Sequence, residues 1–121
     1  MPRINPFLKY LGKEDHLQHQ VYNYYLYTYR KKALFFHTPN ESKRSPFERF
    51  KAKYLGILAG VSDIIMVKDH NVLFLELKIK YNKPTENQEI FLANTKIFGF
   101  TSEIAYTFED ATKIIDEFME D

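Results

Sequence analysis

Cysteine and long apolar runs are both absent from this chain of 121 residues. Without cysteine the protein has no disulfide and no thiolate metal site, a composition compatible with a reducing cytosol. No stretch is apolar over a length that could span a bilayer. The opening residues, MPRINPFLKYLGKED, also lack the apolar core of a signal peptide. We therefore expect a cytoplasmic protein with no membrane partner.

Internal repeats and low-complexity linkers are also lacking, so we expect one domain over residues 1–121, with an irregular segment at 1–12. Net charge is small, at +1, but it is unevenly distributed. Residues 30–53 hold eight Lys or Arg against two acids, and residues 103–121 hold seven acids against one lysine. This segregation indicates an anionic partner held on one side, or simply two solvated faces.

The apolar periodicity predicts helices and strands in the order α-β-α-β-β-α-β-α. We expect helices at about 14–30, 46–59, 85–99 and 108–119, and strands at 33–38, 64–67, 72–80 and 103–106. Ser45 is the expected N-cap of the second helix and Gly60 its stop. A turn at 69–71 makes a hairpin of the second and third strands. The fold class is therefore α/β, with helices packed on a mixed sheet.

Two of the predicted strands carry charges that a buried strand should avoid. In VLFLELKIK, alternate residues from Leu73 to Ile79 form an aliphatic face that should pack on the core. Glu76 and Lys78 share the other face, about 7 Å apart, where we expect it to open to water. The hairpin places Asp63, which begins the preceding strand, roughly opposite residue 77.

Two carboxylates this close repel each other, so one acid would tend to stay protonated, and a divalent cation bridging them removes the conflict. Hard oxygen ligands completed by water and a substrate phosphate suit Mg²⁺ or Mn²⁺. A neighbouring lysine could position or deprotonate the attacking water and balance charge on the phosphate. Phosphodiester hydrolysis fits this chemistry. The alternative is an ordinary ion pair between Glu76 and Lys78 on the strand surface.

The chain carries, in this order, the motif GVSD, then a strand, then LELK and then TENQ. This order of motifs resembles that of the VRR-NUC family of nucleases, a branch of the PD-(D/E)xK superfamily. KEDHLQHQV is similar to the family's opening helix, and FHTPNESKRS to its histidine- and asparagine-containing loop. The resemblance implies a restriction-endonuclease-like fold. Two departures are Ser62 in place of the family's proline and Glu41-Ser42 in place of glycines. We expect Asp63 to keep its position despite Ser62, whereas the loop without glycines should be less permissive.

By this resemblance Lys78 would be the catalytic base, and Gln88 would steady the water or the phosphate. The implied metal ligands for Mg²⁺ or Mn²⁺ are Glu14, Asp63 and Glu76, with the backbone carbonyl of Ile64 or Leu77. No organic cofactor is implied. Stand-alone relatives of phage or bacterial type imply a homodimer that cuts branched DNA, Holliday junctions above all. A nucleic-acid-binding module without catalysis, or the same chemistry on flaps, nicked duplex or single strands, are the alternatives.

Basic residues near these motifs are candidates for contacts to phosphates, which position a duplex without reading its sequence. The candidate DNA-binding residues are Asn40, Lys43, Arg44, Arg49, Lys51, Lys53, Lys80 and Lys83. His16 and His19 lie three residues apart on the first predicted helix. They are either a shared metal site or two surface histidines. His37 is either a buried histidine bonded to a carbonyl in the protein or a contact with substrate. The tyrosines of residues 22–29 point in too many directions for one core stripe, so core packing, a subunit interface and stacking on unpaired bases all stay open.

Overall fold

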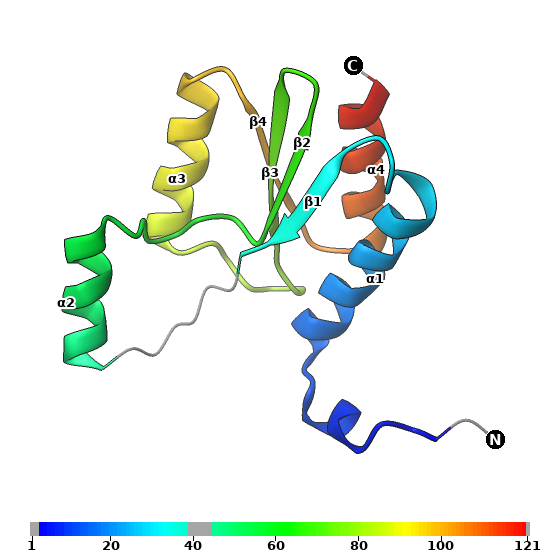
Figure 1. The fold of residues 1–121 in the computed structure, drawn as a ribbon, viewed down its shortest axis with the longest axis horizontal. Coiled ribbons are helices and arrows are strands. Elements are labelled where there is room, and N and C mark those ends of the chain that lie inside the picture. The colour runs from blue at the N-terminus through cyan, green and yellow to red at the C-terminus, as the bar shows by residue number, and fades with distance from the viewer. Residues whose placement is uncertain (1–2, 39–44, 121) are drawn as a thin grey trace.

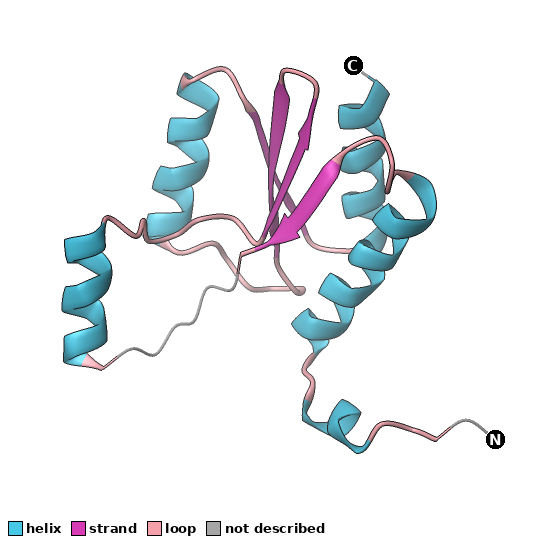
Figure 2. Cartoon of the chain, viewed as in Figure 1, coloured by secondary structure: helices cyan, strands magenta, loops and turns pink. Residues whose placement is uncertain are grey.

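In the computed structural model, which describes residues 3–38 and 45–120, a four-stranded sheet lies between helices (Figures 1 and 2). The elements are a 3-10 helix at Pro6–Tyr10, α1 (Lys13–Thr28), β1 (Leu34–His37), α2 (Pro46–Leu55), β2 (Ile64–Lys68), β3 (Asn71–Leu77), α3 (Glu86–Ile97), β4 (Thr101–Ala105) and α4 (Phe108–Glu120). The predicted order and the α/β class are confirmed. The 3-10 helix lies inside the N-terminal segment for which we expected irregular backbone.

The strands lie in the order β1-β2-β3-β4, with β2 antiparallel to both β1 and β3, and β4 parallel to β3. The predicted mixed sheet is therefore confirmed. Lys68 pairs with Asn71, so the hairpin turns through two residues, and Asp69 takes a positive φ of 41° there. Because the turn is one residue shorter than predicted, the pairing of β2 with β3 is shifted by one position, and Ile64 lies opposite Leu75.

One face of the sheet packs on α1 and α4 and forms the main core. The buried side chains there are Leu17, Val21, Tyr25, Ile64, Met66, Leu73, Leu75, Leu77, Ala105, Ala111, Ile115 and Phe118. The alternation of VLFLELKIK thus places its leucines against the core, as predicted from the sequence. Burial of such aliphatic side chains supplies most of the free energy that favours folding.

The opposite face of the sheet is covered by α3. Phe74 meets Phe91 edge to face, with ring centroids 5.3 Å apart, and also contacts Phe100 at 6.1 Å. Ser102 donates a hydrogen bond from its hydroxyl to the carbonyl of Leu92, at 3.0 Å. Our expectation that this face opens to water at Glu76 is wrong, because α3 covers it and leaves that side chain 1% exposed.

Two element ends also differ from the prediction. β3 ends at Leu77 instead of residue 80, although the Lys78 N–H still bonds to the carbonyl of Ala105, at 2.9 Å. α2 ends at Leu55, because Gly56 takes a left-handed φ of 82° and caps the helix four residues before Gly60.

Helix α2 stands beyond α3, away from the sheet (Figure 1). Its start is as predicted: the Ser45 hydroxyl accepts from the Glu48 N–H, and the Glu48 carboxylate accepts from the Ser45 N–H, each at 3.2 Å. Large apolar side chains of α2 and the following loop are exposed, namely Phe47, Phe50, Tyr54, Leu55, Ile57 and Leu58. We refer to these six residues as the α2 patch.

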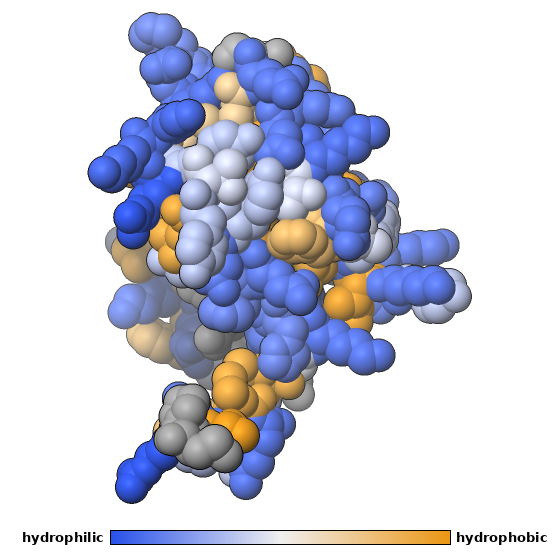
Figure 3. All heavy atoms as spheres, turned by 90° about the vertical axis from the view of Figure 1, so that its right-hand side faces the viewer, coloured by the Kyte–Doolittle hydropathy of each residue, from blue (hydrophilic) through white to orange (hydrophobic). Residues whose placement is uncertain are grey.

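The side of the molecule that presents α1 and α4 is mostly hydrophilic, and apolar atoms gather at its lower end over the N-terminal segment (Figure 3). Ile4, Phe7 and Leu8 are among the exposed apolar residues of that segment.

None of the helices in the described ranges combines the length and the apolar character required to traverse a bilayer.

Candidate active site

Asp63 directly precedes β2, and both its backbone and its carboxylate are fixed. Its carbonyl accepts from the Thr38 N–H and from His37 Nδ1, each at 2.8 Å. Since a carbonyl can only accept, Nδ1 must carry the proton. The carboxylate accepts from the Leu77 N–H at 2.8 Å, across the pair of strands. Asp63 is therefore aimed at the end of β3.

Ser62 is buried and supports the same turn. Its hydroxyl donates to the carbonyl of Ile64 at 3.1 Å, and its own carbonyl accepts from the Thr38 hydroxyl. Serine at this position thus satisfies its polar atoms locally and leaves Asp63 in place, as we expected where the family's proline is missing.

Glu76 lies at the end of β3 beside Asp63 and is almost completely buried. Its Oε1 accepts from the Gln88 side-chain amide at 3.2 Å and lies 3.9 Å from the Lys78 ammonium. Its Oε2 is buried and has no hydrogen-bond partner among the described residues. An unsatisfied buried oxygen costs about 1–3 kcal/mol, so Glu76 is not placed here for stability.

Burial and the proximity of Asp63 raise the pKa of Glu76 to about 9, and the nearby Lys78 opposes that rise. The side chain is therefore protonated near neutral pH when no cation is bound. A carboxylic acid held neutral by desolvation and a second acid is a common property of functional sites.

Gln88 is positioned by the start of α3. Thr85 caps this helix: its hydroxyl accepts from the Gln88 N–H at 3.2 Å, and its N–H donates to Gln88 Oε1 at 2.8 Å. The nitrogen of the same amide group donates to Glu76. Gln88 thus fixes the start of a helix and orients the buried acid at once.

Gly60 brings the loop before Asp63 against this helix start. It has a φ of 80°, and a Cβ there would lie 2.4 Å from the backbone of Asn87 and 2.7 Å from the nitrogen of Gln88. Only glycine fits such an approach. The prediction that Gly60 stops the second helix is wrong, and its place is in the support of the site.

Glu14 reaches the same cluster from the first turn of α1. Burial and the charge of Asp63 raise its pKa, and Lys78 lowers it, so all three side chains interact electrostatically. The helix start itself is fixed by Asp15, whose carboxylate accepts from the Gly12 N–H at 2.9 Å. The structure therefore brings together the predicted residues Asp63, Glu76, Lys78 and Gln88, and it places Glu14 within electrostatic range of them.

The donor set at this cluster fits a hard divalent cation. In the parts of the chain that the structure describes, no three His, Asp or Glu side chains are arranged so that they could hold a metal ion together. Mg²⁺ needs fewer protein ligands, because it keeps several waters and binds through one or two carboxylates with substrate phosphates. Asp63 and Glu76 Oε2 are the carboxylate oxygens that would hold it, and the Leu77 carbonyl is the backbone ligand that the resemblance implies.

The predicted DNA-binding residues divide into three groups. Arg49, Lys51 and Lys53 are exposed on α2, which stands apart from the acidic cluster. Lys80 and Lys83 are exposed in the loop that follows Lys78, next to the cluster along the chain. The other predicted contacts, Asn40, Lys43 and Arg44, lie outside the described residues.

The histidines and tyrosines that sequence reasoning left open have separate places. His37 is bonded to a protein carbonyl but is exposed, so the prediction of a buried histidine is wrong, and the contact with substrate stays a prediction. His19 contacts Asn23, at 3.2 Å. Tyr24 and Tyr29 both donate to the carboxylate of Asp116, which holds α1 against α4.

Sequence reasoning missed the supporting roles of Gly60 and Thr38. A glycine three residues ahead of the expected ligand was a usable signal for Gly60, because close backbone approach is a known reason for glycine in such a loop. Nothing in the sequence marks Thr38, since its contacts depend on the pairing of β1 with β2.

Two solved structures resemble this chain over most of its length. One, named "VRR_NUC domain protein", has a TM-score of 0.70 and 19% identity, covering 91% of this chain and 90% of the other. Another, named "VRR_NUC domain", has a TM-score of 0.62 and 15% identity, covering 89% of this chain and 99% of the other. No protein-family model matches the sequence, and no curated protein does so either. The chain therefore has the fold of VRR-NUC domain proteins, which fits the restriction-endonuclease-like architecture that its motifs indicated.

Proposed function

We propose that this protein is a divalent-metal-dependent endodeoxyribonuclease that hydrolyses phosphodiester bonds in branched DNA, in the cytoplasm. The observation that carries the proposal is the acid pair Asp63 and Glu76, with one buried Glu76 oxygen that has no partner among the described residues. A protein without catalysis has no physical reason to keep an unsatisfied acid in a sheet that α3 covers. The shared fold with VRR_NUC domain structures supports the same assignment.

In this proposal Asp63, Glu76 and the carbonyl of Leu77 hold Mg²⁺ or Mn²⁺, and Glu14 contributes from α1. When bound, a divalent cation supplies Lewis-acid polarisation of the phosphate and neutralises the two carboxylates. Gln88 orients Glu76 through its amide. Lys78 Nζ would position the attacking water and balance the charge that develops on the phosphate, and to act as the base it must first release the proton of its ammonium group.

Branched DNA, and Holliday junctions in particular, is the proposed substrate, and a homodimer is the proposed assembly. Two sites related by a twofold axis suit a junction of similar symmetry. The exposed α2 patch supports an interaction surface, since monomers rarely expose many large apolar side chains together. Arg49, Lys51 and Lys53 on the same helix supply positive charge for phosphates.

A nucleic-acid-binding module without catalysis is the second candidate function, and cleavage of flaps, nicked duplex or single strands is a variant of the first. One experiment separates them. The protein is incubated with a four-way junction, a flap, a nicked duplex and a single strand, each with Mg²⁺, Mn²⁺ or EDTA, and the products are resolved on a gel. We expect metal-dependent nicks near the branch of the junction. Binding without products under every metal would favour the module.

Two matched variants test the assignment of the site. Lys78→Met should abolish cleavage but leave DNA binding, whereas Lys96→Met, an exposed lysine at the end of α3, should leave both unchanged. A thermal melt with Mg²⁺ or Mn²⁺ adds a readout that needs no DNA, because an ion that binds only the folded state raises the melting temperature. Glu76→Gln should lose that rise. Cleavage by Lys78→Met at the wild-type rate contradicts the catalytic assignment.

A further inference from the structure

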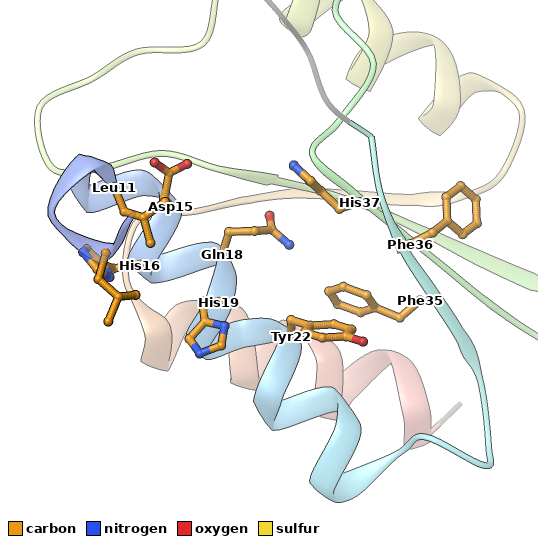
Figure 4. Close-up of a pocket in the computed structure, with 10 residues that line it drawn as sticks. Leu11, Asp15, His16, Gln18, His19, Tyr22, Phe35, Phe36 and His37 are labelled. Carbon is orange, nitrogen blue, oxygen red and sulfur yellow. The ribbon is translucent and has the colours of Figure 1, made fainter. Parts of the chain in front are cut away.

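A cavity of about 430 Å³ opens beside the candidate active site, between the first half of α1, the edge strand β1 and the N-terminal segment (Figure 4). This volume is within the range of about 300–1,000 Å³ that small-molecule sites occupy. The residues that matter in its lining are Asp15, Gln18, His19, Tyr22, Phe35 and His37. The proposed cleavage chemistry uses none of them.

An aromatic wall closes one side of the cavity. The rings of Tyr22 and Phe35 lie 5.7 Å apart, and Phe35 stacks at 4.8 Å on Tyr25, which is buried. The Tyr25 hydroxyl donates to the carbonyl of Ala33, so this support is itself fixed. Tyr22 remains 42% exposed. The wall therefore presents an aromatic surface that is already positioned before anything binds.

Hydrogen-bonding side chains surround that aromatic surface. Gln18 extends between Asp15 and His37, and His19 lies next to Tyr22 along the helix (Figure 4). These side chains include both donors and acceptors. A ligand that is a flat ring with polar groups around its edge fits this lining. The aromatic side chains would stack on the face of the ring, and the polar side chains would bind its edge.

Two lining residues of the cavity neighbour residues of the acidic cluster. His37 lines the cavity and bonds through Nδ1 to the carbonyl of Asp63, the predicted metal ligand. On the other side, Asp15 lines the cavity and directly follows Glu14, whose pKa is raised by burial and by Asp63. A group bound in the cavity thus lies next to the phosphate that the proposed site would receive.

We propose that this cavity receives an unpaired nucleobase of the DNA, adjacent to the cleaved phosphate. A base inside a duplex cannot enter, because its faces are covered by its neighbours and its edge is occupied by its partner. Bases at a bulge or a flap are already unpaired, and a base pair at the branch point of a junction opens at lower cost than one inside a duplex, because it has lost a stacking neighbour. The inference rests on the proposed function and deepens it, since selection for branched DNA would come from an unpaired base held by Tyr22.

The test uses the full chain and a duplex with one bulged 2-aminopurine, whose fluorescence falls when it stacks on an aromatic ring. Binding is measured in EDTA, so that cleavage does not interfere. Fluorescence anisotropy then compares this duplex with one that carries an abasic nucleotide at the bulge and with a fully paired duplex. The variants are Tyr22→Leu, Tyr22→Phe and, as a matched control, Tyr27→Leu, which alters a tyrosine of the same helix that is 91% exposed.

We expect quenching and preferential binding of the bulged duplex by the wild type, Tyr22→Phe and Tyr27→Leu. Tyr22→Leu or the abasic nucleotide should weaken binding about tenfold, the typical effect of losing one base–aromatic stack. If Tyr22→Phe retains quenching and preferential binding, the aromatic ring of Tyr22 is the group that matters. The same result shows that a change at this position does not unfold the protein. Equal binding of bulged, abasic and paired duplexes overturns the inference.

Failure of this inference and failure of the proposed function give different results. Metal-dependent cleavage that is unaffected by Tyr22→Leu and by the abasic nucleotide rejects the base site and keeps the nuclease. Quenching that depends on Tyr22, with no cleavage under any metal, keeps the base site and rejects the nuclease.

Discussion

Helices α2 and α3 begin in the same way but have different roles. Each opens with a capping box, made by Ser45 with Glu48 in α2 and by Thr85 with Gln88 in α3. In α3 the capping amide also donates to Glu76, and the helix covers one face of the sheet. In α2 most of the large apolar side chains are exposed. Capping therefore sets where a helix starts, and packing decides whether it supports the site.

The largest expected effect on stability concerns two glycines with nearly the same backbone geometry, one at the end of α2 and one against the start of α3. Gly56 ends α2 with a φ of 82°, and a Cβ there would meet open space, whereas Gly60 has a φ of 80° and lies against the backbone of Asn87. Gly56→Ala should cost about 1–2 kcal/mol for the left-handed conformation alone. Gly60→Ala should cost about 1–3 kcal/mol more, because overlap with backbone forces a shift.

Chemical denaturation of both glycine variants measures this difference directly. Because the two φ values nearly match, the excess cost of Gly60→Ala reports the contact with the start of α3. Equal stabilities for the two variants would show that the loop before Asp63 can move away from α3 freely.

The same pair of glycines shows how far the sequence could be read. Local signals predicted the element order, the N-cap Ser45 and the aliphatic face of β3, because each depends on residues that are near one another in the chain. Which glycine ends α2 could not be predicted, since Gly56 and Gly60 are equally good stops by local criteria. The contact of Gly60 with Asn87 exists only after α3 has packed on the sheet.

The site shows the same limit. Strand alternation placed Glu76 and Lys78 on one face, and the hairpin placed Asp63 next to them. The burial of Glu76 could not be predicted, because it depends on how α3 covers that face. The repulsion between Asp63 and Glu76 predicted that one acid stays protonated, but because we expected open water there, we did not expect the larger rise in pKa that burial causes. The role of His37 depends on the pairing of β1 with β2, which local patterns do not reveal.

The pH dependence of stability gives the second test, which concerns the acid that α3 buries. The pKa of Glu76 is raised to about 9 in the folded protein from 4.5. Between these values the folded state holds a proton that the unfolded state has lost, so stability falls as pH rises. We expect the melting temperature of the metal-free protein to drop between about pH 5 and pH 9.

Glu76→Gln should remove most of this pH dependence, because an amide cannot lose the proton. Glu103→Gln, an exposed carboxyl of β4, is the matched control and should leave the profile unchanged. If the Glu76→Gln profile has the same slope as the wild type, burial by α3 does not control the ionisation of this acid.

The third test compares the two capping side chains. Gln88→Ala removes a hydrogen bond to the start of α3 and the donor to Glu76 Oε1, so we expect a loss of about 1–3 kcal/mol in unfolding free energy. Glu48→Ala removes the corresponding capping contact of α2 and should cost about 0.5 kcal/mol. Urea denaturation at pH 7 measures both, and a larger loss for Glu48→Ala would reverse the assignment of roles.

The smallest effect on stability should come from α2, whose basic side chains we expect to contact DNA instead of the protein. Arg49→Ala with Lys53→Ala changes two exposed residues, so the free energy of unfolding should stay within about 0.5 kcal/mol of the wild type. If both side chains neutralise phosphates, the slope of log affinity against log salt should become shallower by about 2. Lys96→Ala with Lys113→Ala, exposed on α3 and α4, is the charge-matched control and should not alter the slope. A slope that changes equally in both double variants would mean that general positive charge, and no particular contact of α2, attracts the DNA.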